Sequence, residues 1–447
     1  MPHYARDTIV AAATPPGKGG IGIVRISGDD AERLATAMLG NVPEPRLATH
    51  AKIHDRNGNE LDSGIALYFP EPASYTGEAV LEFHGHGGPV VVAAVIGAAV
   101  ELGARRAEPG EFSKRAFLNG KLDLVQAEAI ADLIDSGTSQ AARAALRSLS
   151  GSFSSAVEDL QQELINLRLH VEAAIDFPED EIDFLSDQDL LRKIAECTEA
   201  FAKLQREAGI GRVLRDGLQV VIVGKPNVGK SSLLNLLSGQ EAAIVTEVAG
   251  TTRDILRERI EIDGMAVELV DTAGLREDPD RIEAEGIRRA REALKNADGA
   301  LWIQDASESV AGKPDEEIPG DIPVIILRNK IDVTGDPPGP SISDESTLNV
   351  SAKTGAGIDD LREALRRLAG YQDLGEGAFT ARRRHVEAIA MAAEHFQRGR
   401  EALEQQKAGE LFAEDLRLSH QALGEVTGAI SSDDLLGRIF SEFCIGK

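Results

Sequence analysis

The spacing of apolar residues changes along the chain and predicts a different kind of structure in each part. Residues 8–13 and 21–27 form short apolar or alternating runs, Asn57-Gly58 is typical of a hairpin turn, and residues 90–102 have helical character. Short strands mixed with helices predict an α+β domain over residues 1–118.

The middle and the end of the chain share a helical pattern. Leu160, Leu164, Leu167 and Val171 recur at the spacing of a buried helix face. We therefore expect a helical bundle domain whose first part is residues 119–216 and whose second part is residues 373–447. Strands and helices alternate between these parts, so residues 217–372 are predicted to form an inserted α/β domain.

Composition indicates a water-soluble protein with several domains. The chain has 447 residues, of which 42% are hydrophobic and 27% charged, and no apolar run reaches membrane-spanning length. Cys197 and Cys444 are the two cysteines, which argues against a disulfide framework. These features predict a cytoplasmic protein with no membrane association.

The charge balance limits how the chain can contact nucleic acid. A formal net charge of −26 argues against wrapping a phosphate backbone with the whole surface. Any such contact is expected to be local or to be made by a partner. The densest basic run, residues 382–384, is interpreted as the solvated face of a helix.

The clearest motif is a phosphate loop. Residues 224–231 read Gly-Lys-Pro-Asn-Val-Gly-Lys-Ser, between a predicted strand at 218–223 and a predicted helix from residue 232. Backbone N–H groups of such a loop bind phosphate oxygens, Lys230 adds a positive charge, and Ser231 offers a hydroxyl to Mg²⁺. The motif predicts a nucleotide site on a Ras-like P-loop fold.

Four further motifs follow in the chain order of a GTPase. Asp271 begins Asp-Thr-Ala-Gly, which predicts an Mg²⁺ contact through water and a glycine that senses the γ-phosphate. Asp332 of Asn-Lys-Ile-Asp can accept both N–H groups of guanine, which favours GTP over ATP. Ser351-Ala352-Lys353 is expected to close over the base, and Thr251-Thr252 to supply a hydroxyl to the metal.

Two positions point to an unusual hydrolysis mechanism. Leu275 follows the Asp-Thr-Ala-Gly motif, where small Ras-like GTPases have a glutamine that orients the attacking water. Hydrolysis must therefore be promoted differently. Asn227 could place a carbonyl oxygen beside the phosphates and ligate a monovalent cation there, although a simple turn residue is the alternative.

The whole chain resembles the MnmE family of tRNA-modifying GTPases, also called TrmE. The residues that carry the resemblance are Thr-Pro-Pro-Gly at 14–17, Gly-Gly-Ile-Gly-Ile-Val-Arg at 19–25, Gly-His-Gly-Gly at 85–88, Gly-Glu-Phe-Ser at 110–113, Gly-Thr-Thr-Arg-Asp at 250–254 and the ending Cys-Ile-Gly-Lys at 444–447. The resemblance implies a folate-binding and dimerising N-terminal domain, a helical domain and an inserted GTPase domain.

The resemblance also implies an activity and its partners. A homodimer, activated by K⁺ and Mg²⁺, would form a heterotetramer with MnmG (GidA), a tRNA-modification protein that binds FAD. Together they would add a carboxymethylaminomethyl or aminomethyl group to C5 of the wobble uridine, position 34, of certain tRNAs. The one-carbon unit would come from 5,10-methylenetetrahydrofolate or 5-formyltetrahydrofolate.

Site residues can be carried over from the family position by position. The K⁺ ligands implied are Asn227, Thr246, Val248 and Thr251, and those of Mg²⁺ are Ser231 and Thr252. The water-orienting glutamate falls on Glu283, which chemistry alone does not distinguish from its acidic neighbours. The implied GTP site comprises Asn227, Val228, Gly229, Lys230, Ser231, Ser232, Thr246, Glu247, Val248, Ala249, Gly250, Thr251, Thr252, Asp271, Thr272, Ala273, Gly274, Asn329, Lys330, Asp332, Ser351, Ala352 and Lys353.

The folate site is implied at both ends of the chain. Arg25, Glu82, Lys121 and Lys447 match the family's folate-binding positions, and Cys444 is a candidate for chemistry beside them. Surface ion pairing is the alternative for the charged residues, and a frayed helix end for the cysteine.

The histidines near the N-terminus and Cys444 near the C-terminus each allow a further interpretation. His84 and His86 could suggest a metal pair, but without a third ligand at suitable spacing we expect a glycine-flanked structural turn. A lipid anchor at Cys444 is not expected, because Gly446 and Lys447 do not fit a prenylation signal.

A second class of function shares the same GTPase motifs. A GTP-controlled assembly factor or ribosome-associated switch would use its N-terminal domain to bind a protein rather than folate. The N-terminal motifs and the terminal Cys-Ile-Gly-Lys favour the modification enzyme. Unchanged wobble uridines in cells that lack the protein would favour the switch, whereas loss of their modification is what an enzyme predicts.

Overall fold

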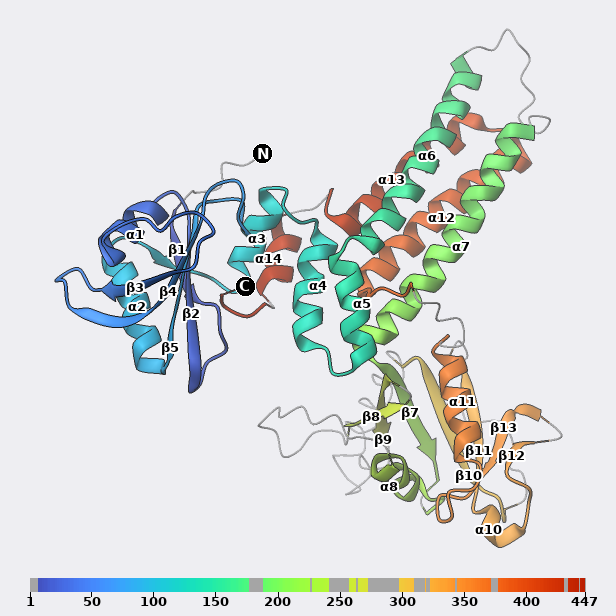
Figure 1. Cartoon of the computed structure of the whole chain (residues 1–447). Coiled ribbons are helices and arrows are strands. Elements are labelled where there is room, and N and C mark those ends of the chain that lie inside the picture. The colour runs from blue at the N-terminus through green and yellow to red at the C-terminus, as the bar shows by residue number, and fades with distance from the viewer. Residues whose placement is uncertain are drawn as a thin grey trace, which may run out of the picture. The chain divides into compact units, whose positions relative to one another are not determined.

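The computed structural model confirms a multidomain α/β protein. It describes residues 7–176, 188–225, 227–240, 257–262, 264–271, 297–308, 318, 322–341, 344–370, 377–429, 433–441 and 443–446. The chain divides into two compact units, the first made of Met1–Ala131 and Gly424–Lys447 and the second of Asp132–Leu423 (Figure 1). Within the described residues, none of the helices is sufficiently long and apolar to span a bilayer.

The first unit is built on a six-stranded sheet with the order β3-β4-β5-β2-β1-β6. Its strands are β1 (Ile9–Ala12), β2 (Gly19–Ser27), β3 (Thr49–His54), β4 (Glu60–Phe69), β5 (Val80–Gly87) and β6 (Arg105–Arg106). The predicted early strands and the hairpin at Asn57-Gly58 are confirmed, because β3 and β4 pair antiparallel across that turn. The predicted helix at 90–102 is α2 (Pro89–Glu101).

Side chains alternate between the two faces of this sheet. Val24, Ile26 and Phe83 are buried in one cluster with residues of α1 (Ala31–Leu39) and α2. On the other face, Phe112 of α3 (Glu111–Leu118) packs with Ile9 and the neighbouring residues of β1. Strand residues between these core positions, including Arg25 and Glu82, therefore project on the α3 side.

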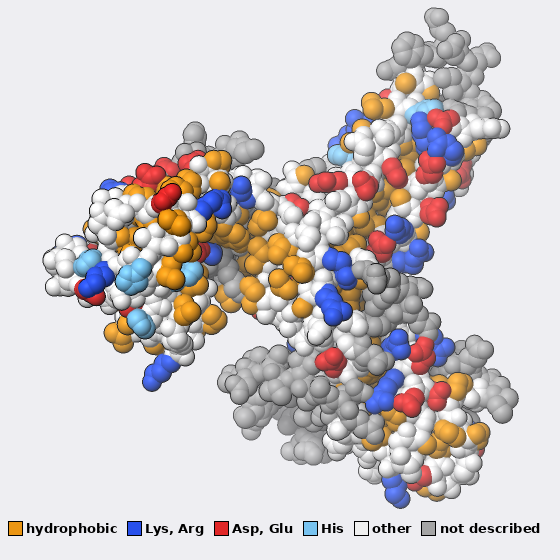
Figure 2. Space-filling model, in the orientation of Figure 1, with side chains coloured by type: hydrophobic (Ala, Val, Ile, Leu, Met, Phe, Trp, Pro, Cys, Tyr) orange, Lys and Arg blue, Asp and Glu red, His pale blue; other side chains and the backbone are white. Residues whose placement is uncertain are grey.

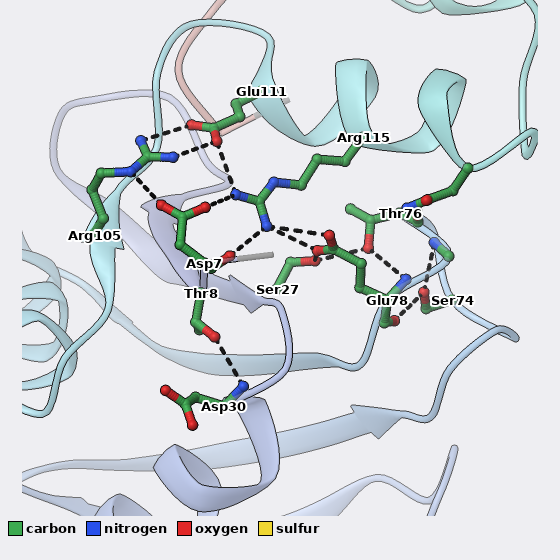
Figure 3. Close-up of polar contacts among 12 residues, drawn as sticks. Asp7, Thr8, Ser27, Asp30, Ser74, Thr76, Glu78, Arg105, Glu111 and Arg115 are labelled. Carbon is green, nitrogen blue, oxygen red and sulfur yellow. Dashed lines mark hydrogen bonds and ion pairs between the residues drawn. The ribbon is translucent and has the colours of Figure 1, made fainter. Parts of the chain in front are cut away.

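A buried arginine joins three parts of the first unit (Figure 3). Arg115 of α3 is fully buried and donates to the carbonyl oxygen of Asp7 at 2.7 Å, to Glu78 at 3.0 Å and to Glu111 at 2.9 Å. Arg105 also donates to Asp7 and Glu111. Because each carboxylate is paired, the network holds the 70–79 loop against α3 at an acceptable desolvation cost.

The C-terminal residues of the first unit pack on its N-terminal domain. Residues of α14 (Asp433–Ser441) and α4 (Leu124–Asp135) share a hydrophobic cluster. Beyond α14, Ile445 forms an antiparallel bridge with Pro109, and the Gly110 N–H donates to the carbonyl of Cys444 at 3.3 Å. The described part of the tail is thus docked on the domain, which is not what a frayed helix end would show.

A helical bundle forms the larger part of the second unit. The long helices α6 (Ser152–Asp176), α7 (Gln188–Asp216), α12 (Arg383–Gln406) and α13 (Gly409–Thr427) run beside one another, whereas α5 (Ser139–Leu149) is short (Figure 1). The predicted row Leu160, Leu164, Leu167 and Val171 is buried, as a helix-face spacing requires. In the space-filling view, acidic and basic side chains intermix on the visible face of these helices (Figure 2).

The basic run at 382–384 is not simply a solvated face. The Arg382 side chain is largely buried, and its Nη2 donates to Asp132 at 2.8 Å. Arg215, in the last turn of α7, donates to the same carboxylate oxygen at 2.8 Å. One aspartate therefore joins the two chain segments that lead into and out of the inserted domain, a contact that the charge run alone did not indicate.

The inserted domain contains a seven-stranded sheet with the order β12-β13-β11-β10-β7-β9-β8. Its strands are β7 (Leu218–Gly224), β8 (Arg257–Ile262), β9 (Met265–Asp271), β10 (Gly299–Asp305), β11 (Val324–Asn329), β12 (Gly339–Ser341) and β13 (Asp344–Val350). Its helices are α8 (Lys230–Gln240), α10 (Ile331–Thr334) and α11 (Ile358–Leu368). Strands β9, β7, β10, β11 and β13 are parallel, so their carboxyl ends meet at one edge, where such sheets bind ligands.

Candidate functional site

The phosphate loop lies between β7 and α8, as its sequence predicted. Asn227 has a left-handed backbone with φ of 64° and is exposed, so its side chain is free to face a ligand. Gly229 has a φ of 101°, and a Cβ there would lie 2.2 Å from the side-chain nitrogen of Asn329. Only glycine satisfies both the backbone conformation and this close approach.

Lys230 begins α8 and turns back over the loop. Its Nζ donates to the carbonyl oxygens of Gly224 at 2.7 Å and Lys225 at 2.8 Å. The ammonium is therefore held where the loop closes, at the N-terminal end of the helix. Ser231 and Ser232 follow in the first turn and are exposed. This arrangement is suited to an anionic ligand.

Asn329 ties the phosphate loop to the base-binding motifs. Its side chain is buried, its Nδ2 donates to the carbonyl of Val228 at 2.8 Å, and its Oδ1 accepts from the N–H of Ala352 at 2.9 Å. The residue thus bridges two loops that are far apart in the chain. The phosphate loop, Asn-Lys-Ile-Asp and Ser-Ala-Lys segments are brought together as predicted.

Asp332 is oriented by its neighbours. Its Oδ1 accepts from the hydroxyl of Ser351 at 2.7 Å, and the Nζ of Lys353 lies 4.0 Å from Oδ2. The Ser351 oxygen in turn accepts from the N–H of Thr354 at 3.2 Å. A carboxylate fixed in this way can accept two parallel N–H bonds, as guanine recognition requires.

Asp305 is a partner of this site that the sequence analysis did not single out. It ends β10 and pairs with Lys330 at 2.6 Å. The Lys330 ammonium and then Ser307 lower the pKa of Asp305 to about 2. Its position at the carboxyl end of a central parallel strand was a usable signal, since such strand ends gather at the ligand-binding edge.

Several predicted residues of the nucleotide site lie outside the described part of the chain. They include the cation-binding segment, the end of the Asp-Thr-Ala-Gly motif and the water-orienting glutamate: Thr246, Glu247, Val248, Ala249, Gly250, Thr251, Thr252, Thr272, Ala273, Gly274, Leu275 and Glu283. Asp271 ends β9 at the same edge of the sheet as the phosphate loop.

Arg25 and Glu82 form the centre of a second candidate site, in the first unit. They are cross-strand partners on β2 and β5, with Arg25 Nε 2.7 Å from Glu82 Oε1. The guanidinium carbon lies 5.2 Å from the ring centre of Tyr75 and 5.7 Å from that of Phe112. A cation and a carboxylate beside aromatic rings suit a ligand that carries both a polar heterocycle and an acidic group.

Lys121 contacts the loop of residues 70–79 that carries Tyr75. Its Nζ donates to the carbonyl of Pro72 at 3.1 Å, while Tyr75 donates or accepts a bond with Ser113 at 2.8 Å. The loop is therefore fixed at several points, and it carries Tyr75 over Arg25. The sequence analysis gave neither aromatic a role: Phe112 lies within the Gly-Glu-Phe-Ser motif without an assigned function, and Tyr75 is positioned by a loop that no motif marks.

The described residues of the terminal motif lie close to the same strands. Gly446 has a φ of 98°, and a Cβ there would lie 1.9 Å from the carbonyl oxygen of Ala12. Ala12 pairs with Val24, the residue before Arg25. Cys444 is exposed, and Lys447 lies outside the described residues. The tail thus reaches the sheet that carries Arg25.

The prediction of a glycine-flanked structural turn at His84 and His86 is wrong. Both lie on strand β5, where His84 Nε2 is 3.1 Å from Glu82 Oε2 and His86 Nδ1 is 2.7 Å from Asp62 Oδ1. The flanking glycines are accommodated within the sheet, because Gly85 and Gly87 pair with Gly22 and Gly19 of β2.

Comparison with known proteins adds an independent observation. A family model described as the MnmE helical domain matches residues 124–444, and one described as the GTP-binding protein TrmE N-terminus matches residues 8–121. The tRNA modification GTPase MnmE of Pseudomonas savastanoi pv. phaseolicola is 54% identical over 455 residues, which cover 100% of both chains. That of Stutzerimonas stutzeri is 53% identical over 452 residues, covering 99% of both.

Solved structures give a much weaker match. The G domain of the T. maritima FeoB iron transporter is 23% identical and covers 34% of this chain and 98% of its own, with a TM-score of 0.25. A score this low adds nothing to what the family models and the relatives show.

Proposed function

The chain belongs to the MnmE (TrmE) family of tRNA modification GTPases, and from this premise we propose the finer features of its activity. It is a GTP hydrolase that takes part in tRNA modification. We propose that it acts as a K⁺-activated homodimer together with a FAD-binding partner of the MnmG type. The product is a carboxymethylaminomethyl or aminomethyl group on C5 of the wobble uridine, with folate as the one-carbon source.

The observation that carries the folate part of this proposal is the aromatic-flanked Arg25–Glu82 pair. A tetrahydrofolate has a pterin ring that donates N–H bonds and a glutamate tail that carries negative charge. A half-buried carboxylate suits the former, and a guanidinium suits the latter. Lys121 and Lys447 are proposed to complete the site, and the docked tail places Cys444 in the same unit.

The nucleotide part of the proposal assigns a role to each described motif. Asp332 recognises guanine, Asn329 joins the two binding loops, and Lys230 faces the phosphates. Ser231 with Thr252 would hold Mg²⁺, and Asn227 with Thr246, Val248 and Thr251 would hold K⁺, while Glu283 would orient water. The exposed, left-handed Asn227 fits a cation ligand; when bound, the cations would supply positive charge beside the phosphates.

The domain boundaries also belong to this proposal. We assign residues 1–118 to folate binding and dimerisation, 119–216 and 373–447 to the helical domain, and 217–372 to the GTPase domain. The partner is proposed to make most of the contacts with tRNA, in keeping with the net charge of −26 and with the intermixed charges of the helices (Figure 2).

Mass spectrometry of tRNA nucleosides tests the proposal. A strain lacking the gene is complemented with the full chain, with Arg25→Ala, with Glu82→Gln, or with Arg33→Ala as a control at an exposed side chain of α1 in the same domain. The full chain and the control should restore the modified wobble uridine, whereas the two site variants should not. Modified wobble uridines in the strain that lacks the gene would favour the GTP-controlled switch instead, and restoration by both site variants would remove Arg25 and Glu82 from the folate site.

A further inference from the structure

Glu82 contacts a second side chain, that of His84, to which the proposed function assigns no role. One carboxylate oxygen accepts from Arg25 Nε at 2.7 Å, and the other lies 3.1 Å from Nε2 of His84. A carboxylate only accepts hydrogen bonds, so the imidazole must donate from Nε2. His84 and Glu82 are two residues apart on β5, a spacing that places both side chains on one face.

We propose that His84 is a positioning residue of the folate site, which holds the carboxylate of Glu82 in the orientation that receives the pterin ring. The inference rests on the proposed folate function and deepens it. Arg25 and His84 bind opposite oxygens of the same carboxylate, so together they set its plane. Either oxygen keeps a further acceptor position for a ligand N–H group.

The surroundings of His84 are consistent with this role. Its side chain is 26% exposed and that of Glu82 is 14% exposed, so the pair lies at the rim of the site rather than in the core. Across the neighbouring strands, Ile65 and Ile23 are its register partners, and Ile65 is 44% exposed. The histidine therefore stands between aliphatic side chains, which limit the directions in which its ring can turn.

His86 provides a natural contrast on the same strand. It is 72% exposed and is bonded to Asp62, not to Glu82. The neighbouring histidines thus have separate acidic partners, and only His84 is linked to the Arg25–Glu82 pair. Proximity in sequence is therefore not what distinguishes His84; its contact with Glu82 is.

The experiment measures binding of 5-formyltetrahydrofolate to the full chain by titration calorimetry. His84→Leu removes the donor and should weaken binding about tenfold or more, because a hydrogen bond to a charged group is lost. His84→Gln keeps an N–H donor on a side chain of similar length and should recover most of the affinity. His50→Leu, at an exposed histidine on β3, serves as the matched control and should bind like the unmodified chain.

A double-mutant cycle separates positioning from a direct ligand contact. If His84 acts through Glu82, adding His84→Leu to Glu82→Gln should cause little further loss. Full additivity, or unchanged affinity of His84→Leu, would overturn the assignment while leaving the folate site in place. If the unmodified chain itself fails to bind the probe, the proposed folate function is wrong and the assignment fails with it. Circular dichroism and thermal unfolding of each variant verify that the protein, including its first unit, is folded.

Discussion

Replacing Asp332 with asparagine should convert a guanine-selective site into one that prefers xanthine. The Ser351 oxygen accepts from the N–H of Thr354, so its hydroxyl hydrogen is directed to Oδ1 of Asp332. In Asp332→Asn that hydrogen keeps the amide oxygen in the Oδ1 position, and the NH₂ group replaces Oδ2. A donor then faces the N–H groups of guanine, while xanthine offers an oxygen at that position.

The magnitude follows from the hydrogen bond that is lost. A bond to a charged group contributes about 1.5–3 kcal/mol, and each 1.4 kcal/mol is a factor of ten. GTP affinity should therefore fall about 10- to 150-fold, and affinity for xanthosine triphosphate should rise. The fold should be retained, because the bond to Ser351 persists and the substituted group lies at the surface of the site.

Competition binding with GTP, ATP and xanthosine triphosphate measures this change. Asp359→Asn is the matched control, since this aspartate is 94% exposed at the start of α11. Ser351→Ala in the Asp332→Asn background should reduce the new preference, because the amide is then free to turn over. If Asp332→Asn leaves the ratio of GTP affinity to xanthosine triphosphate affinity unchanged, Asp332 does not belong to the base site and the reasoning is refuted.

Four further outcomes are expected from the same structure. Replacing Na⁺ by K⁺ at constant ionic strength should raise the rate of GTP hydrolysis, and Asn227→Ala should flatten that dependence while leaving nucleotide affinity largely intact; equal rates in both salts would contradict the cation site. Arg115→Met should lower the free energy of unfolding by about 3–5 kcal/mol in denaturant titrations, because it leaves the buried carboxylate of Glu78 without its arginine partner. Burial alone raises the pKa of Glu111, but its hydrogen bonds from Arg105 and other groups outweigh burial and lower the pKa. The stability that Glu111 contributes is therefore present above its unfolded-state pKa and is lost as the pH falls through its folded-state pKa. Acid titration of the unmodified chain should show this loss of stability more strongly than titration of Glu111→Gln. Deleting residues 444–447 should spare GTP hydrolysis but abolish tRNA modification. Normal modification by the truncated chain would show that these four residues have no role in the reaction.

The described part of the nucleotide site could be predicted from sequence because the phosphate loop, Asn-Lys-Ile-Asp and Ser-Ala-Lys motifs each follow a strand. Residues at the carboxyl ends of β7, β11 and β13 meet at one edge once these strands are parallel neighbours. Local patterns therefore located Asn329, Asp332 and Ser351 without any knowledge of strand register. The helical spacing of α6 was predicted for the same reason, since a helix face depends only on nearby residues.

The site around Arg25 and Glu82 could not be derived in this way, because the register between strands determines which residues become neighbours. Arg25 and Glu82 are 57 residues apart, and they meet only because β2 and β5 pair in the observed register. A shift of one residue would turn Glu82 and His84 together to the opposite face and separate Glu82 from Arg25. The resemblance supplied Arg25 and Glu82, but it did not supply His84, Tyr75 or Phe112, which the tertiary fold brings to this pair.

Buried charges show the same limit over longer distances. Arg382 pairs with Asp132 across 250 residues, and Arg115 reaches Asp7 across 108. Composition favours solvated arginines, because a charge loses hydration on burial, and only a specific acidic partner reverses that preference. Such partners come from segments that the tertiary fold brings together. Arg115 and Arg382 hold elements of this protein together, yet the sequence around each of them favours a place at the surface.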